Sequence, residues 1–512
     1  MSVPPLPPST AAAPGPADAW ATEPATRFEG PRGWLEGLRY GFMGFPLAFV
    51  ALPLYVVWPN HYARAYGVSL ATLGALLLLV RLFDAVVDPL IGQWVDRLGR
   101  RGRAAGPLAV GGPGVASGGQ APAEAAGAEI SYKKTALRTA VFTSLLLIVG
   151  FWALFFPPDW AGTQPADRVV WAVGALVVTY LAYSLLSVLH QSWGARLGGS
   201  ATQRGRIVGW REGLGLAGVV VASVLPTAAG LPALATTLAL ALGVACLLWA
   251  QAVVPRAASP TSAQALHGMP SQTADGAPQA HALQAHTPHA QTPVDRSRWT
   301  DAFWPLRQRG FRRLLAVFVV NGMASAVPAT LVLFFIQDRL QAPTALEPLF
   351  LGAYFLCAAA SIALWLRAVR RWGLARTWLG GMLLSVAVFG WVLTLGAGDW
   401  PAFVAVCMLS GLALGADLVL PAALLNGLIH DMGARGEREG SFMGWWSFAT
   451  KLNLALAAGV ALPLLGALGY QPGQTDAAAT QALTLAYGLV PCLLKLLAAG
   501  LLLIFFIRKE PA

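Results

Sequence analysis

Long apolar runs separated by short polar stretches account for most of the chain. Runs of roughly 20 residues, the length of helix that spans the hydrocarbon core of a bilayer, occur at 38–59, 68–95, 136–157, 168–190, 207–229, 232–254, 311–336, 347–368, 376–396, 400–426, 440–468 and 480–507. Several of these runs contain proline, which membrane helices tolerate as a kink. The pattern predicts an all-α membrane protein with about twelve transmembrane helices.

Two long polar stretches interrupt this pattern. Residues 255–300 are rich in Ala, Gln, His and Pro and show no periodicity, which is typical of a flexible linker. Residues 104–130 form a second, similar insert on the cytoplasmic side. The predicted order is a disordered tail (1–35), a six-helix bundle (36–254), the linker (255–300), a second six-helix bundle (301–508) and a C-terminal tail (509–512).

Basic residues are concentrated in alternate loops. They are dense at 96–138, 196–211, 296–313, 367–376 and 435–438, whereas the loops between these are nearly free of them. Loops rich in Lys and Arg remain in the cytoplasm. We therefore expect a bacterial-type inner membrane protein with both termini in the cytoplasm. The same distribution accounts for the net charge of +11 without a nucleic-acid partner.

The composition agrees with the membrane prediction. Hydrophobic residues make up 56% of the chain and charged residues 12%, whereas soluble domains carry about 25% charged residues. The four cysteines lie singly in apolar runs, without the spacing of a disulfide or metal site. The polar loops contain no nucleophile–base or metal-ligand spacing, so we expect neither an enzyme nor a resident cofactor.

The sequence GQWVDRLGRR (92–101) follows the second predicted helix. At every constrained position it resembles the loop signature Gly-x-x-x-Asp-Arg/Lys-x-Gly-Arg/Lys-Arg/Lys of the major facilitator superfamily, and six-plus-six helices are also that superfamily's layout. We interpret the segment as a conformational latch, in which Gly92 permits close helix approach and ion pairs of Asp96 and Arg97 break when the bundles rock. The predicted latch residues are Gly92, Asp96, Arg97, Gly99, Arg100 and Arg101.

Three ionisable residues lie inside the second apolar run. Arg81, Asp84 and Asp88 are three and four residues apart, so they share one face of a helix. Ionisable groups within a membrane helix indicate function by default, and Pro89, which lacks an N–H group, frees a backbone carbonyl one turn earlier. The face therefore predicts an oxygen cage for Na⁺ or a site where one carboxylate holds a proton. A structural ion pair between Arg81 and the aspartates is the alternative.

The stretch RLFDAVVDPLIG (81–92) resembles the second-helix signature of the glycoside–pentoside–hexuronide:cation symporters, the melibiose-permease group. The stretches YGFMGFPLAF, YSLLSVLHQSWGARL, RGRIVGWREG and GEREGSFMGWWSFATK resemble other parts of that family, so the resemblance covers most of the chain outside the tail and the two inserts. It implies that Asp84 and Asp88 bind the coupling cation, with Lys451 close by. It also implies that Arg211 lies near the substrate.

The chain departs from this family where the sugar is bound. Ala48, Ser187, Gly427 and His430 stand at positions that hold carboxylates, or in one case an asparagine, in the family. The cation residues thus match, whereas the sugar-binding carboxylates do not.

Five side chains are candidates for substrate binding: Arg211, Asp417, Ser187, Tyr55 and Trp193. For Arg211 the alternative is an anchor at headgroup level, and for Asp417 it is a structural ion pair, for example with Lys451. For Tyr55 and Trp193 the alternative is packing or a place in the interfacial aromatic belt.

The leading functional hypothesis is a symporter that couples a small organic solute to Na⁺ or H⁺ by alternating access, with the bilayer and the solute as partners of a monomer. A proton-driven exporter of hydrophobic or amphiphilic compounds is the alternative, since the sugar carboxylates are missing. A transport-inactive receptor or scaffold that uses 255–300 for docking is a third hypothesis. The paired aspartates and the complete loop signature favour a transporter over this last possibility.

Overall fold

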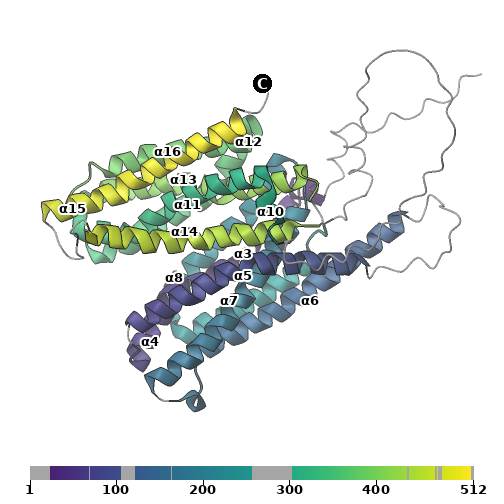
Figure 1. Cartoon of the computed structure of the whole chain (residues 1–512), viewed down its shortest axis with the longest axis horizontal. Helices are drawn as coiled ribbons and strands as arrows, with labels where there is room; N and C mark the ends of the chain where they lie inside the picture. The colour runs from purple at the N-terminus through teal and green to yellow at the C-terminus, as the bar shows by residue number, and fades with distance from the viewer. Residues whose placement is uncertain are drawn as a thin grey trace, which may run out of the picture.

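The computed structural model describes residues 24–68, 70–104, 121–162, 164–255, 302–434, 437–467, 470 and 476–508. Within these residues the fold is all-helical and contains no strand. Figure 1 shows two groups of helices, one formed by α2 to α8 and the other by α10 to α16. We call them the first and second helix groups. The predicted division at 255–300 stays a prediction, because residues 256–301 lie outside the described part.

The first membrane helix is interrupted by short non-α turns. It consists of α2 (Gly33–Gly41), α3 (Gly44–Leu52), a π-helical turn (Pro53–Val57) and α4 (Trp58–Tyr66). Gly67, at φ +66°, ends α4 in the left-handed conformation that glycine adopts without strain. The next helix, α5 (Leu70–Ala104), is continuous through Pro89.

Two long helices each bend at one glycine. α8 (Ala201–Gln251) bends at Gly230, where φ is +79°, and α12 (Glu347–Val392) bends at Gly373, where φ is +74°. A side chain with a Cβ is strained at such angles, so these glycines permit the turn between successive membrane helices. Each of the two long helices therefore provides two of the predicted transmembrane segments.

The other helices complete the two groups. In the first group they are α6 (Ala121–Phe155) and α7 (Pro165–Arg196). The second group contains α10 (Trp304–Arg307), α11 (Arg309–Phe334), α13 (Trp400–Asp431), α14 (Glu439–Ala467), α15 (Ala477–Thr484) and α16 (Val490–Leu502). Single turns occur at Pro24–Phe28, Asp159–Ala161, Phe335–Arg339, Thr344–Leu346, Leu485–Leu489 and Leu503–Ile507.

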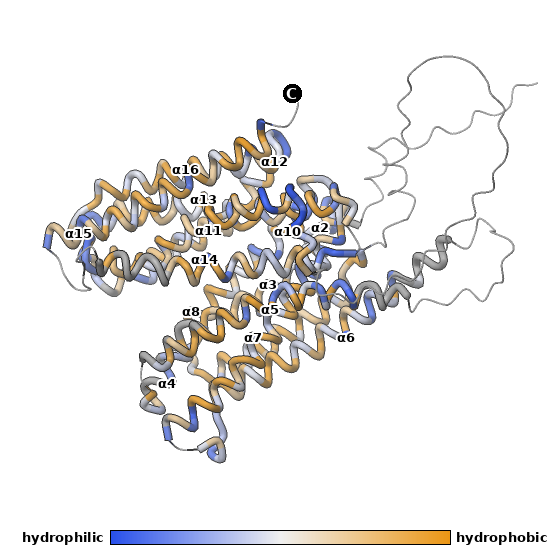
Figure 2. The backbone as a smooth tube through the Cα atoms, in the orientation of Figure 1, coloured by the Kyte–Doolittle hydropathy of each residue, from blue (hydrophilic) through white to orange (hydrophobic). Residues whose placement is uncertain are grey.

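The all-α membrane prediction is confirmed. Among the described residues, eight helices are long and apolar enough to cross a membrane, and one of them is the bent α12. The three remaining predicted segments coincide with the α2–α4 run, α5 and α14. Outward-facing side chains are apolar, for example Phe142 (67% exposed) and Val149 (63% exposed) on α6, and Figure 2 shows hydrophobic residues along the outside of both groups.

Two expectations for the polar segments were wrong in part. The predicted tail 1–35 includes a helical turn at Pro24–Phe28, where Phe28 is buried and meets the ring of Tyr40 edge-on. The predicted insert 104–130 includes the start of α6 at Ala121. That part of the insert is rich in alanine and glutamate, which favour helix.

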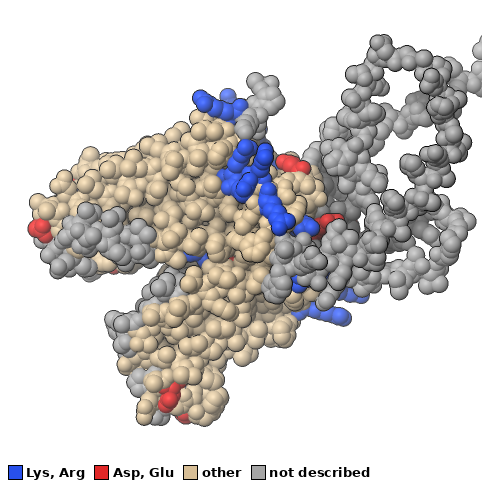
Figure 3. Space-filling view, in the orientation of Figure 1, with Lys and Arg blue, Asp and Glu red and all other residues tan. Residues whose placement is uncertain are grey.

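The two helix groups meet at one end and separate at the other. Contacts between them join α5 to α14 and α8 to both α12 and α13. Figure 3 shows arginine and lysine side chains where the groups meet, near α10, and a gap between the groups toward α4 and α15. We call the joined end, which carries Arg307, Arg309 and Arg312, the basic end. On the predicted topology it is the cytoplasmic end.

Candidate functional site between the helix groups

A lysine from the second helix group lies between two aspartates from the first. The Nζ atom of Lys451 on α14 is 2.5 Å from Oδ2 of Asp84 and 2.8 Å from Oδ2 of Asp88, both on α5. The ammonium also donates to Oγ of Ser184 on α7 at 2.7 Å, and this hydroxyl donates to Oδ1 of Asp84 at 2.5 Å. Asp84 and Asp88 are 1% and 0% exposed. We call Asp84, Asp88, Ser184 and Lys451 the inter-group site.

Close helix packing brings these side chains together. Asp84, Asp88 and Gly92 recur every four residues and so lie on one face of α5. On α14, a Cβ at Gly444 would lie 2.4 Å from the carbonyl oxygen of Asp88, so the two backbones touch there. Lys451 is seven residues further along α14, two turns on the same face, and therefore reaches the aspartates.

The inter-group site is unbalanced in charge. One ammonium faces two carboxylates, so the fully ionised site carries a net charge of −1. Charge buried away from water is unfavourable unless it is compensated. In this conformation the ammonium occupies the place between the carboxylates where the sequence predicts a cation. A proton on one carboxylate, or a metal cation that replaces the ammonium at one of them, would make the site neutral.

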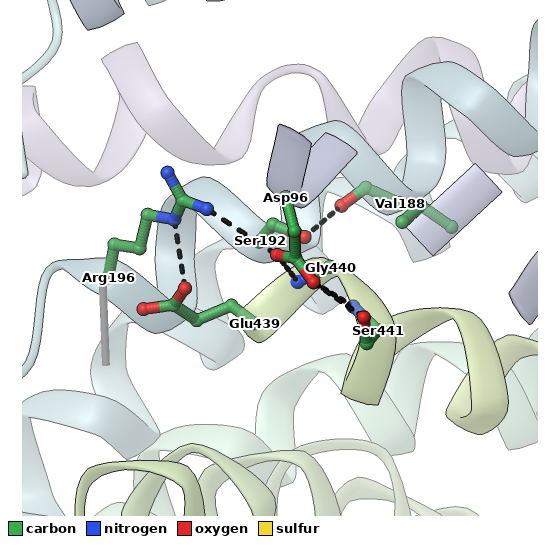
Figure 4. A network of polar contacts seen from close by, with 7 residues as sticks. All are labelled: Asp96, Val188, Ser192, Arg196, Glu439, Gly440 and Ser441. Carbon is green, nitrogen blue, oxygen red and sulfur yellow. Dashed lines mark hydrogen bonds and ion pairs between the residues drawn. The ribbon is translucent and has the colours of Figure 1, made fainter. Parts of the chain in front are cut away.

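A second set of contacts closes the basic end. Asp96 on α5 accepts hydrogen bonds from the backbone N–H groups of Gly440 (2.7 Å) and Ser441 (2.8 Å), and from Oγ of Ser441 (2.6 Å), all at the start of α14. Arg196, at the end of α7, donates to Glu439 at 3.1 Å and lies 3.6 Å from Oδ1 of Asp96. Figure 4 shows these residues converging from both helix groups. We call Asp96, Arg196, Glu439, Gly440 and Ser441 the closing cluster.

The geometry of the closing cluster relies on small residues and a helix start. A Cβ at Gly92 would lie 2.1 Å from the carbonyl oxygen of Gly440, and one at Gly440 would lie 2.3 Å from that of Gly92. Backbone N–H groups in the first turn of a helix lack intrahelical partners and favour a carboxylate. Asp96 therefore acts as an N-terminal cap for α14 that comes from the other helix group. Such contacts must break if the groups separate at this end.

The structure places the remaining latch residues differently from the sequence prediction. Asp96 pairs with Arg196, whereas Arg97 forms no ion pair among the described residues. The backbone of Gly99, Arg100 and Arg101 belongs to α5, but the surroundings of Gly99 and the two arginine side chains are not described, so their predicted part in the latch stays a prediction.

The predicted cation-site and substrate residues are only partly described. The side chains of Arg81 and Tyr55 lie outside the described residues, so the predicted ion-pair support and substrate contact stay predictions. Arg211 pairs with its neighbour Glu212 at 2.5 Å, and Ser187 accepts a hydrogen bond from Gln191 at 2.9 Å. Both residues are partly exposed.

Trp193 is fully buried in this conformation. Its ring stacks on Tyr132 and meets Trp249 edge-on, and its indole N–H donates to the carbonyl oxygen of Val253 at 3.2 Å. These contacts are those of a packing residue in the first helix group, so Trp193 presents no free surface to a solute here.

Asp417 belongs to a second buried network, which lies wholly within the second helix group. It forms an ion pair with Lys495 on α16, not with Lys451. Its Oδ1 accepts hydrogen bonds from Nδ2 of Asn321 on α11 (3.1 Å) and from Nε1 of Trp378 on α12 (2.9 Å). Lys495 also donates to Oδ1 of Asn321 at 2.7 Å. We call Asp417, Lys495, Asn321 and Trp378 the intra-group network.

One position at which the chain departs from the symporter pattern lies at a contact between the two helix groups. A Cβ at Gly427 on α13 would lie 2.9 Å from Nη2 of Arg204, which projects from α8 of the first helix group. The guanidinium of Arg204 thus lies directly against Gly427 in this conformation. Gly427 therefore serves a contact between the groups.

Several residues of these sites were missed by reasoning from the sequence. Ser184 and Arg196 lie in the same stretch as Ser187, and Glu439 and Ser441 precede Lys451, but only contacts across the two helix groups reveal their roles. Lys495 carried a usable signal, since it is an ionisable residue within the apolar run 480–507.

Membrane-length helices in two groups, joined across a buried charged site, define a polytopic membrane protein. A family model described as "MFS/sugar transport protein" matches residues 37–121, 136–265 and 284–509. The chain therefore belongs to this family of the major facilitator superfamily. The narrower resemblance to the melibiose-permease group stays a prediction.

Solved structures share the fold at low sequence identity. A bacterial homologue of the iron transporter ferroportin, in an outward-facing state, matches with a TM-score of 0.60 and 16% identity over 95% of this chain and 100% of that one. The human organic anion transporter MFSD10 (TETRAN) matches with a TM-score of 0.54 and 16% identity over 93% of this chain and 98% of that one. A comparison with curated proteins finds no match.

Proposed function

We propose that this protein is a secondary transporter that couples a small organic solute to a monovalent cation, H⁺ or Na⁺, by symport. The observation that carries the proposal is the ion pair between Lys451 of one helix group and both Asp84 and Asp88 of the other, inside the membrane. In this account the protein is a monomer of the inner membrane with both termini in the cytoplasm.

The charge of the inter-group site supplies the coupling. With Lys451 in place and no added cation, the ionised site carries −1, which opposes its enclosure when the two groups close around it. A proton or Na⁺ that binds Asp84 or Asp88 makes the site neutral and weakens the hold of Lys451. Enclosure of cation and solute together is then favoured over enclosure of either alone, which is positive coupling between the two ligands.

In this account, the closing cluster determines whether the basic end is open or closed to the solute. While Asp96 caps α14 and Arg196 binds Glu439, the basic end is shut and the gap lies at the opposite end. A solute reaches the cytoplasm after these contacts break and the opposite end closes, as expected when the two repeats rock about a central site.

The test begins with a thermal-shift screen of the purified full-length protein against sugars, organic anions and amphiphiles, with and without Na⁺ and at two pH values. A ligand that binds the folded state raises the unfolding temperature. The solute so identified is then used for uptake into proteoliposomes that carry an imposed Na⁺ or H⁺ gradient.

The decisive comparison is between the double variant Asp84→Asn/Asp88→Asn and the matched control Asp159→Asn, which removes an exposed carboxylate outside the site. We expect the double variant to lose gradient-driven uptake and the control to keep it. Unchanged gradient-driven uptake in the double variant would contradict the coupling assignment. Solute efflux driven by an inward proton gradient would instead support the exporter.

A further inference from the structure

A cavity of about 630 Å³ lies between the two helix groups, separate from the inter-group site. Its walls come from three places: the N-terminal segment 28–34, the first part of α8 (206–214) and the part of α12 just before its bend at Gly373 (359–370). The first two belong to the first helix group and the third to the second. None of the four residues of the inter-group site lines this cavity.

The cavity is polar at one end and apolar along its length. Arg206 on α8 and Arg367 and Arg370 on α12 line it near the basic end. From Arg370 back to Ala359 the wall of α12 spans 11 residues, or about 16 Å at 1.5 Å per residue. The lining residues along this stretch are Leu366, Ala363, Ile362 and Ala359, faced by Gly209, Gly213 and Leu214 of α8.

The three arginines retain N–H groups that can donate hydrogen bonds to a ligand. Arg367 and Arg370 are exposed and form no ion pair within the described part of the chain. Arg206 donates to the carbonyl oxygen of Phe28 at 3.2 Å, which uses one of its five N–H groups. The carboxylate among the lining residues, Glu29, already accepts a hydrogen bond from Gln203 at 2.9 Å. Three guanidinium groups and one carboxylate leave the lining with a net charge of +2.

This combination matches one class of ligand. Guanidinium groups bind phosphate oxygens through paired hydrogen bonds, and basic pockets between membrane helices on the cytoplasmic side bind lipid headgroups. Trp34, a lining residue that is 60% exposed, is of a type enriched at the membrane–water interface. A soluble anion would use only the arginines and leave the apolar length of the cavity empty.

We propose that this cavity binds one anionic phospholipid of the cytoplasmic leaflet. Its phosphate lies at Arg206, Arg367 and Arg370, and an acyl chain lies along Ala363 and Ala359. Because both helix groups contribute to the walls, the bound lipid links them at the basic end and stabilises the state in which that end is closed.

The test uses native mass spectrometry of the purified full-length protein, titrated with phosphatidylglycerol or, separately, phosphatidylcholine. We expect phosphatidylglycerol to bind more tightly by about tenfold or more, since each arginine near the headgroup adds to the attraction. The triple variant R206Q/R367Q/R370Q should lose this preference. The matched control R307Q/R309Q/R312Q removes three exposed arginines of the same end outside the cavity and should keep it.

A second pair of measurements distinguishes binding of a lipid from binding of free phosphate and from nonspecific attraction to positive charge. Ala363→Trp fills the apolar length but leaves the arginines, so it should abolish phosphatidylglycerol binding, and millimolar inorganic phosphate should not displace the lipid from the unaltered protein. Displacement by phosphate, equal binding of the two lipids, or equal losses in both triple variants would overturn the proposal. Far-ultraviolet circular dichroism and thermal unfolding show that each variant is folded. None of these readouts depends on transport.

Discussion

The described part of the molecule contains two buried lysine–aspartate sites that differ in charge and location. In the inter-group site one lysine faces two aspartates and the residues come from both helix groups. In the intra-group network one lysine faces one aspartate, and every member belongs to α11, α12, α13 or α16 of the second group. With both carboxylates ionised, the first site carries a net charge and joins the two helix groups. The second is neutral and lies within one part.

From this difference we infer that the inter-group site serves coupling and that the intra-group network serves stability. The intra-group network satisfies both oxygens of Asp417 and needs no further ion, so we expect it to hold α11, α12, α13 and α16 in place. Among the described side chains, the inter-group site holds one more carboxylate than ammonium, and the proposed mechanism requires its contacts to rearrange during each cycle. The substrate-binding role predicted for Asp417 stays a prediction, and it requires a solute to replace a donor such as Trp378.

The largest effect on transport should come from Lys451→Met. Loss of the ammonium leaves two facing carboxylates, which then retain a proton and no longer respond to the gradient. We expect gradient-driven uptake to fall about 10²-fold. Lys134→Met, at an exposed position on α6, is the control. Uptake that stays within about twofold of the unaltered protein would show that Lys451 is not part of the coupling.

The largest effect on stability should come from Lys495→Met. Removal of one partner from a buried ion pair destabilises a protein by about 3–5 kcal/mol, because the other charge is left without compensation. Adding Asp417→Asn should recover most of the loss. The measurement is thermal unfolding of both variants in detergent. A double variant that is no more stable than the single one would show that the network does not behave as a structural ion pair.

A smaller effect is expected from Gly440→Ala in the closing cluster. The added methyl group would strike the carbonyl oxygen of Gly92 at 2.3 Å, and overpacking of this kind costs about 1–3 kcal/mol. We expect the population closed at the basic end to fall relative to the open one by about tenfold or more. Spin labels at Lys134→Cys and Arg312→Cys, in a background without native cysteines, report the distance between the groups.

The control for this experiment is Gly174→Ala, since no atom lies within 4 Å of a Cβ at that position. The distance distribution of the control should match that of the unaltered protein. An unchanged distribution in Gly440→Ala would contradict the assignment of the closing cluster.

The smallest effect is expected from substitution of Ser184, and Ser187, one turn away on α7, provides the comparison. Ser184 contacts both Lys451 and Asp84, whereas Ser187 contacts Gln191. Loss of one buried hydrogen-bonding group costs about 1 kcal/mol, so Ser184→Ala should change the apparent affinity for the coupling cation several-fold. Ser187→Ala should leave that affinity unchanged. The opposite ranking would move the cation site one turn along α7.

The sequence was sufficient for the fold and for one face of the candidate site. Apolar runs of membrane length predicted the helices, and the spacing of Asp84, Asp88 and Gly92 predicted a common face on α5. The bends at Gly230 and Gly373 agree with predicted boundaries, because a run of membrane length must end before the next begins.

The partners of those residues could not be predicted in the same way. Arg196 binds Glu439, 243 positions later in the chain, and Lys495 binds Asp417 from a different helix. Such pairs depend on which helices touch and at what height, and neither hydrophobic periodicity nor local spacing contains that information. At the start of α6 the error was of another kind, since the linker-like residues before Ala121 concealed a helix that alanine and glutamate favour.

The most direct test of the coupling account is cation binding to the purified protein without any solute. Binding of radioactive Na⁺, and release of protons into weak buffer, are measured for the unaltered protein, for Asp84→Asn/Asp88→Asn and for the control Asp159→Asn. The net charge of −1 in the inter-group site predicts one cation per chain, lost in the double variant and kept in the control. Equal cation binding by the double variant and the unaltered protein would contradict the account.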